Sequence, residues 1–262
     1  MVEVNMEGLK TSLSNFKGAT PFHHCVVDQF FSTPFAQRLE DEFPDYDDRA
    51  WHVYCNPLEN KKTLNDWNRF PPATYQTFHY LCSEEFLQNV LRTSLGLPLF
   101  PDFGLHGGGW HIHGQGGNLN PHFDYHLHPK LGMVRKLNLI IYLSSTLDPV
   151  LHGGELGFWE HDSILHRPGN LAKTISPLFN RAVLFDTTQN SWHGMVKPLS
   201  IPAGIFRKSL AVYYVIPAEE KDRTERKRAL YAAREEQRND PNIEEIIKKR
   251  VDEKRFGEVY KT

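Results

Sequence analysis

The sequence predicts an α+β protein with a mainly β core, in which a sandwich or barrel is flanked by N-terminal helices and followed by a charged helical appendage. From about residue 104 the chain divides into short segments rich in β-branched and aromatic residues, separated by Gly, Pro, Asn and Asp. Residues 219–255 have a different texture, with 12 basic and 11 acidic side chains and few apolar ones. These two changes of composition define the predicted organisation.

The bulk composition favours an ordinary globular protein. The 262 residues are 40% hydrophobic and 24% charged, and the formal net charge is -2. This charge gives no reason to expect nucleic acid or an anionic membrane as a partner. Cys25, Cys55 and Cys82 are too few for a disulfide framework or a cysteine-based zinc site. No apolar run reaches membrane length and no signal peptide is recognisable, so a cytoplasmic protein is expected.

The first hundred residues predict a loose N-terminus followed by one strand and several helices. Residues 1–20 are polar and without a strong period, whereas 22–31 favour a strand that runs into a loop. A helix is expected to begin at Ser32 or Thr33 and to end before Pro44, because Phe35, Leu39 and Phe43 recur on one face. Residues 45–72 carry no clear pattern. Two shorter helices are predicted at 73–82 and 84–95.

The β-rich half contains six predicted strand segments. They lie at residues 108–114, 135–144, 154–159, 181–187, 191–196 and 207–216. Their lengths and the turn residues between them are typical of a sandwich or barrel. We therefore expect one domain over residues 1–218, with its β core at about 104–217.

Residues 219–262 are expected to form a separate charged helical extension. Asp240-Pro241 would divide it into two helices, and the sparse apolar residues would pack one edge on the barrel. The alternative is an arm that binds a partner or makes a homo-oligomer.

A candidate metal site begins at His122-Phe123-Asp124. Residues i and i+2 of a strand share a face, so this spacing places an imidazole beside a carboxylate. His193 follows the apolar segment 182–185 and could supply a second imidazole. Two His and one carboxylate form the facial triad of non-haem Fe(II) oxygenases, which leaves coordination positions open.

A candidate anion anchor follows at Arg207. Arg207 and Ser209 would share one face of the strand 207–216, and a guanidinium with a hydroxyl suits a carboxylate ligand. Lys197 and Lys208 are the alternative cations. Lys197 comes early in the chain, and Lys208 would point to the opposite face.

In this order the motifs resemble the prolyl-hydroxylase-like branch of the 2-oxoglutarate/Fe(II) dioxygenases. The order is H-x-D, then G-G-E-L at 153–156, a distal His, and R-x-S entering the last core strand. The resemblance spans about residues 22–216 and implies a double-stranded β-helix, that is, a jelly-roll or cupin-like barrel. It implies Fe(II) bound by His122, Asp124 and His193, with 2-oxoglutarate and O₂ as co-substrates, and it allows for ascorbate.

The same resemblance implies further ligands of 2-oxoglutarate. Arg207 would bind its far carboxylate, and Tyr142 and Ser209 would add hydrogen bonds. Arg207 lies fourteen residues after His193 rather than the family's usual nine or ten, and we expect the turn over 198–204 to contain the excess.

The implied reaction is hydroxylation of a C–H bond with release of succinate and CO₂. The expected substrate is a prolyl residue in a protein or peptide. Free amino acids, sugar-linked compounds and other small metabolites are the alternative, and a non-catalytic 2-oxoglutarate-binding module is a third reading. Trp110, Tyr125, Trp159 and Trp192 are candidates for the substrate wall.

Four further histidines lie near the predicted triad. His126 and His128 continue its alternation, and His111 and His113 precede it. The sequence leaves open whether they line the site or are ordinary polar residues.

Overall fold

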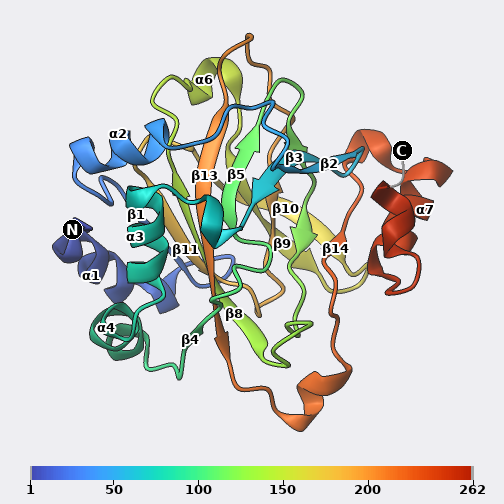
Figure 1. Ribbon diagram of the computed structural model, residues 1–262. Coiled ribbons are helices and arrows are strands. Elements are labelled where there is room, and N and C mark those ends of the chain that lie inside the picture. Colours follow the sequence, from blue (N-terminus) through green and yellow to red (C-terminus); the bar gives the residue numbers. More distant parts are fainter. Residues whose placement is uncertain (1, 261–262) are drawn as a thin grey trace.

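Two antiparallel sheets form the core of the computed structural model, which describes residues 2–260 (Figure 1). In the described residues the strands are β1 (His24–Val27), β2 (His52–Asn56), β3 (Glu59–Leu64), β4 (Phe100–Pro101), β5 (Gly109–His113), β6 (Asn118–Leu119), β7 (His122–Phe123), β8 (Val134–Tyr142), β9 (Leu156–Asp162), β10 (Arg167–Ile175), β11 (Ala182–Asp186), β12 (Trp192–Met195), β13 (Arg207–Ile216) and β14 (Leu230–Tyr231).

The larger sheet has the order β1-β11-β8-β13-β5-β3-β2, with β4 on β13 and β6 on β3. The smaller sheet has the order β10-β9-β12-β7-β14. The predicted mainly β jelly-roll core is therefore confirmed. All six predicted strand segments contain a strand at or near the expected bounds.

The N-terminal helices pack against one face of the larger sheet (Figure 1). In the described residues the α-helices are α1 (Met6–Ser14), α2 (Thr33–Asp41), α3 (Pro72–Leu81), α4 (Glu84–Phe86), α5 (Thr93–Leu95), α6 (Pro149–His152) and α7 (Pro241–Val251). A π-helical stretch, η3 (Leu87–Arg92), joins α4 to α5. Short 3-10 turns are η1 (Phe16–Gly18), η2 (Trp67–Arg69), η4 (Glu220–Thr224), η5 (Glu235–Gln237) and η6 (Phe256–Tyr260).

The main core lies between these helices and the larger sheet. In α2, Pro34 occupies the first turn and Phe35 and Leu39 are buried, as the apolar spacing predicts. The Trp110 ring of β5 packs on Phe43 and Phe70, with centroids 5.5 and 5.0 Å away. These two residues, just after α2 and just before α3, thereby fix the strand that carries His111 and His113.

The expectation of a loose N-terminus is wrong. Residues 6–14 form α1, which begins where the Asn5 side chain accepts a hydrogen bond from Gly8. Leu9 and Leu13 are buried against the core. Two apolar residues four positions apart are enough to dock so short a helix.

The C-terminal segment differs from its predicted form. Residues 219–240 are not a helix, since they contain the turns η4 and η5 and the strand β14. Only α7 is α-helical in the part of this segment that the structure describes. β14 pairs with β7 and so extends the smaller sheet beside His122. The division of the chain at residue 218 remains a prediction.

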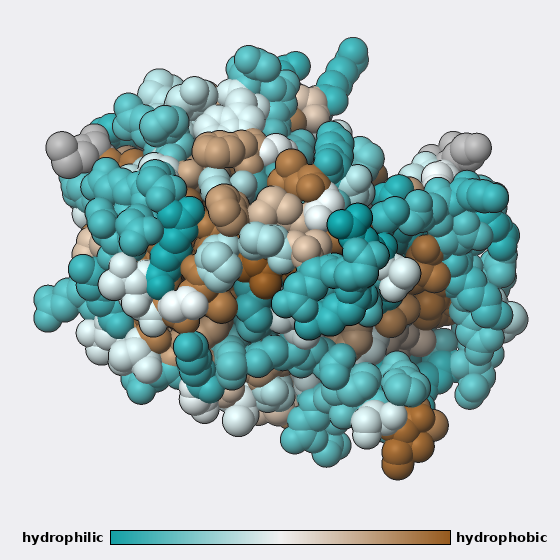
Figure 2. Space-filling view, turned by 90° about the horizontal axis from the view of Figure 1, so that it is seen from below, coloured by the Kyte–Doolittle hydropathy of each residue, from teal (hydrophilic) through white to brown (hydrophobic). Residues whose placement is uncertain are grey.

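The surface is mostly polar. Seen from below, hydrophilic residues cover most of the face, and hydrophobic ones gather in the recesses between them (Figure 2). Every helix within residues 2–260 is too short or too polar to traverse a bilayer.

Candidate active site

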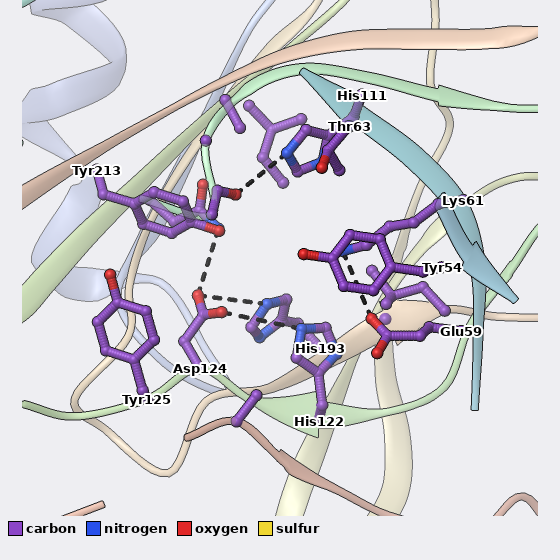
Figure 3. A pocket seen from close by; sticks show the side chains of 18 of the residues that line it. Tyr54, Glu59, Lys61, Thr63, His111, His122, Asp124, Tyr125, His193 and Tyr213 are labelled. Carbon is purple, nitrogen blue, oxygen red and sulfur yellow. Dashed lines mark hydrogen bonds and ion pairs between the residues drawn. The ribbon is translucent and has the colours of Figure 1, made fainter. Parts of the chain in front are cut away.

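Strand pairing brings the three predicted metal ligands together. His122 of β7 and His193 of β12 are direct partners across the smaller sheet, with ring centroids 4.2 Å apart. Asp124 follows β7, and its carboxylate faces both rings (Figure 3). One ligand atom from each residue lies within 4.8 Å of the others, and all three residues are buried. This geometry is compatible with a single metal ion.

Backbone carbonyls orient both imidazoles. Nδ1 of His122 donates to the Asn120 carbonyl at 2.9 Å, and Nδ1 of His193 donates to that of Ser191 at 2.8 Å. A carbonyl only accepts, so the proton is on Nδ1 and the Nε2 lone pair is free. The two Nε2 atoms lie 3.9 and 3.7 Å from the Asp124 carboxylate oxygens. The donor set therefore fits a divalent metal ion without rearrangement of the tautomers.

The charges of the three side chains also suit a metal. Burial, followed by the neighbouring His193, lowers the pKa of His122 to about 3. Burial likewise lowers the pKa of His193. Burial acts to raise the pKa of Asp124, but Arg135 and the two imidazoles outweigh it and the net shift is downward. Neutral imidazoles and an ionised carboxylate are the forms that bind Fe(II).

Arg135 holds Asp124 in place, and sequence reasoning did not identify it. Its Nη1 lies 3.4 Å from the Asp124 carboxylate, and its guanidinium is sandwiched between the rings of Tyr125 and Tyr213 at 3.5 and 3.4 Å. Asn138 Nδ2 lies 3.5 Å from the other carboxylate oxygen. Arg135 and Asn138 are three positions apart on β8, so period-two alternation would place them on opposite faces. The register shift between Leu137 and Arg135 lets both side chains face Asp124, and no pattern in the sequence marked it.

The predicted anion anchor faces the same cavity. Arg207 and Ser209 are buried on β13 and line a cavity of about 370 Å³ together with the three metal-site residues. Arg207 donates to the Gly154 carbonyl at 2.8 Å and to the Tyr142 hydroxyl at 3.3 Å. Tyr142 is not itself a lining residue, and its contact is with Arg207.

The other two cations lie elsewhere. Lys208 donates to the Glu40 carbonyl at 3.3 Å, and neither Lys197 nor Lys208 lines the cavity. Gly154 has φ +90°, and a Cβ there would lie 3.1 Å from Arg207 Cδ. The second glycine of the G-G-E-L motif therefore makes room for the Arg207 side chain.

The four additional histidines divide into two pairs. His111 and His113 line the cavity on β5, next to β13. Neither ring nitrogen of His113 has a hydrogen-bond partner within residues 2–260. His126 instead pairs with Asp222 at 3.0 Å and His128 with Asp102 at 3.2 Å, and neither lines the cavity. Of the aromatic residues predicted for the substrate wall, only Tyr125 is a lining residue.

Residues far apart in the sequence close one side of the cavity, from the ring of His122 across to β3. We call Tyr54, Glu59, Lys61, Tyr231 and Arg250 the outer wall. All five are lining residues, and Figure 3 shows the β3 side chains across the cavity from His122 and Asp124. The Tyr231 ring stacks on His122, with centroids 4.9 Å apart and planes at 13°. The C-terminal segment, which the sequence predicts as a separate extension, therefore contributes residues to the cavity wall.

Arg234 fixes the tail to the segment before β7 and to β12, and β7 and β12 carry His122 and His193. Its guanidinium donates to Asn118 and Asn120 side-chain oxygens at 2.6 and 3.0 Å, and to the Met195 carbonyl at 2.8 Å. Asn120 is also the residue whose carbonyl orients His122. A buried arginine in a highly charged segment was the only sequence signal, and it could not be told apart from its exposed neighbours.

Comparisons with known proteins show what the β-rich part of the chain resembles. Residues 108–215 match the family model of the 2OG-Fe(II) oxygenase superfamily. The match covers less than half of the chain but includes the three metal-site residues and Arg207, and this part is similar to Fe(II)- and 2-oxoglutarate-dependent oxygenases. No curated protein sequence matches the chain.

Solved structures are similar in fold. A prolyl hydroxylase from Trichoplax adhaerens, solved with a peptide fragment of the hypoxia inducible factor oxygen degradation domain, is 16% identical with a TM-score of 0.54. The match covers 82% of this chain and 91% of that one. A Pseudomonas putida prolyl-4-hydroxylase is 14% identical with a TM-score of 0.56, covering 79% and 99%. HygX from Streptomyces hygroscopicus, with nickel and 2-oxoglutarate bound, is 14% identical with a TM-score of 0.50, covering 79% and 86%.

Proposed function

We propose that the chain is an Fe(II)- and 2-oxoglutarate-dependent oxygenase that hydroxylates a prolyl residue of a protein or peptide. Fe(II) would be held by His122, Asp124 and His193, and 2-oxoglutarate would be anchored by Arg207. The observation that carries the metal assignment is the pair of free Nε2 atoms facing one buried carboxylate. The likeness in fold to two prolyl hydroxylases supports the substrate class. When bound, the iron would supply the activation of O₂ for the C–H bond. One oxygen atom would enter the substrate and the other the succinate that forms, with CO₂, from 2-oxoglutarate.

The chain's own residues bind and orient. The Arg207 guanidinium would pair with the far carboxylate of 2-oxoglutarate, and its bond to Tyr142 fixes the direction of the fork. The Tyr142 hydroxyl accepts from Arg207, which leaves its proton free to donate to the same carboxylate. Ser209 is the register partner of Tyr142 and lies beside it. His113, with two unsatisfied nitrogens, would gain a partner when the co-substrate enters.

Arg135 would keep the metal-binding carboxylate in one orientation. It would do so through the contact at 3.4 Å, while Tyr125 and Tyr213 restrict its own motion. Burial of the whole site limits the access of water to the reacting centre.

A free amino acid, sugar-linked compound or other small metabolite is the second candidate substrate. The outer wall favours it, because Tyr231 and Arg250 line the cavity and take up space beside His122. A cavity of about 370 Å³ is within the usual range for small ligands. Assembly into a homo-oligomer through the C-terminal segment remains a prediction.

Mass spectrometry decides between the two substrate classes. The enzyme is incubated with Fe(II), 2-oxoglutarate and either a library of prolyl peptides or a metabolite extract, and products heavier by one oxygen atom are sought. Hydroxylated prolyl peptides would support the first proposal. Products only in the metabolite extract would replace it with the second.

A further inference from the structure

The outer wall holds an ammonium group whose charge is not matched. Lys61 of β3 lines the cavity across from the triad, with its side chain only 13% exposed (Figure 3). Its Nζ has no hydrogen-bond partner within residues 2–260, and its nearest carboxylate oxygen is Glu59 Oε2 at 3.9 Å. Holding a cation in such a place is costly unless an anion joins it.

Glu59 is already satisfied by other groups. Arg250 donates to its Oε1 through Nε at 2.9 Å and through Nη2 at 2.6 Å. The hydroxyls of Tyr260 and Tyr231 donate to Oε1 and Oε2 at 2.5 and 2.8 Å. One carboxylate therefore faces two cations, and the tighter pair is with Arg250. The positive charge of Lys61 is therefore available to a ligand in the cavity.

A second cation lies on the same side. Arg228 lines the cavity, its guanidinium lies 4.0 Å from the Phe256 ring, and within residues 2–260 it forms no ion pair. Lys227 beside it does have a carboxylate, Glu253 at 3.9 Å. Glu59 and Asp124 are the lining carboxylates in the described chain, and Asp124 belongs to the metal site. The substrate side of the cavity is therefore positive.

Burial also acts on Lys61. It lowers the pKa of the ammonium group, and Glu59 offsets this only in part. A bound anion would favour the charged form again. The Lys61 ammonium group is thus suited to a site in which the bound ligand supplies the missing negative charge.

We propose that Lys61, with Arg228 at the rim, binds a carboxylate of the substrate, so that the enzyme acts on acidic molecules. This rests on the proposed hydroxylase function and adds a determinant of specificity to it. A carboxylate held by Lys61 would fix one end of the substrate while a C–H bond near its other end faces the metal site. The carboxylate could be that of the prolyl residue itself or of a neighbouring acidic side chain.

Paired substrates and one substitution test the proposal. The pairs are N-acetyl-prolyl-glutamate amide against its glutamine counterpart, and L-proline against L-prolinamide, each scored by the oxygenated product. Wild-type enzyme should prefer the acidic member of one pair by about 10- to 100-fold in kcat/KM, the usual worth of a hydrogen bond to a charged group. Which pair responds identifies the source of the carboxylate. Lys61→Met should abolish the preference, mainly through KM.

Lys62→Met is the matched control. Lys62 is on the same strand but outside the cavity, where it donates to the Tyr46 carbonyl at 2.6 Å and covers the Tyr46 ring. This variant loses the same charge and should keep the preference for acidic substrates. Equal turnover of acidic and neutral members by wild type would overturn the proposal, as would a preference that survives Lys61→Met.

Two further measurements distinguish this proposal from a role of Lys61 in co-substrate binding and from a failure of the prolyl assignment. If Lys61→Met raises the 2-oxoglutarate concentration needed for substrate-free succinate formation, Lys61 serves the co-substrate and the proposal is wrong. If no prolyl compound reacts, the prolyl assignment fails, and the metabolite extract is then separated on an anion exchanger. Oxygenated products in the anionic fraction that disappear with Lys61→Met would still support the acidic subsite. Products in the neutral fraction alone would refute it.

Discussion

The triad and the outer wall are built in opposite ways. His122 and His193 lie on neighbouring strands, Asp124 directly follows β7, and short motifs in the sequence mark all three. In the outer wall, Glu59 contacts Tyr231 and Arg250, which are 172 and 191 positions away. The comparison teaches that local motifs identify the chemistry, whereas long-range contacts determine what can enter the cavity.

The largest expected effect is at the triad. Alanine in place of His122, Asp124 or His193 should remove bound iron and reduce activity to background, because each supplies one ligand atom. Iron content after dialysis and product formation are the measurements. His126→Ala is the matched control, since this histidine pairs with Asp222 outside the cavity. Near-normal iron content in any of the three variants would show that the ligand set is wrong.

The next effect concerns the stability of the outer wall. Arg250→Met leaves Glu59 buried without its main partner, and breaking a buried pair in this way costs about 3–5 kcal/mol of unfolding free energy. Urea titration measures the loss. Arg255→Met should change stability little, because its pair with Glu245 is exposed to solvent. An unchanged midpoint for Arg250→Met would mean that the tail is not anchored as described.

The co-substrate anchor should respond next. Arg207→Ala removes a charge-assisted contact of about 2–4 kcal/mol, so the affinity for 2-oxoglutarate should fall about 30- to 1000-fold while iron binding persists. Arg207→Lys should recover only part of this, because an ammonium lacks the planar fork. Tyr142→Phe should cost less than either. If Lys197→Ala weakens 2-oxoglutarate binding and Arg207→Ala does not, the anchor has been misplaced.

The smallest expected effect is on metal affinity and comes from Arg135, which faces Asp124. Arg135→Met removes the cation that faces Asp124 while keeping much of the volume between Tyr125 and Tyr213. Loss of such an orienting partner usually weakens metal binding by about 10- to 100-fold. Competition with a metal chelator measures it. Wild-type affinity would show that Asp124 needs no help from Arg135.

The elements that could be predicted from the sequence are those with a clear local pattern of apolar residues. The apolar runs of β8 and β13 predicted strands because both faces of these two strands are largely buried. The spacing of apolar residues in α2 predicted a helix because one of its faces is buried. β10 was missed because it is mostly exposed and contains Pro168 and Gly169, which are unusual within a strand. Its pairing with β9 alone makes it a strand.

For the site, the triad and Arg207 could be predicted because each lies in a short motif. The hairpin of β2 and β3 could not, since its residues 52–64 are polar and half-exposed and their partners are in the tail. A charged segment such as 219–255 gives no sign of which arginine will be buried. Arg234 and Arg250 are distinguished only by the folded contacts that they make.

The most direct test of the enzyme assignment needs no known substrate. Succinate formation is followed in wild-type protein supplied with 2-oxoglutarate, O₂, Fe(II) and ascorbate, with and without a chelator. The account predicts slow succinate formation that depends on Fe(II), is matched by O₂ consumption and is absent in the His193→Ala variant. Tight binding of Fe(II) and 2-oxoglutarate with no succinate formed, or succinate formed equally by His193→Ala, would contradict it.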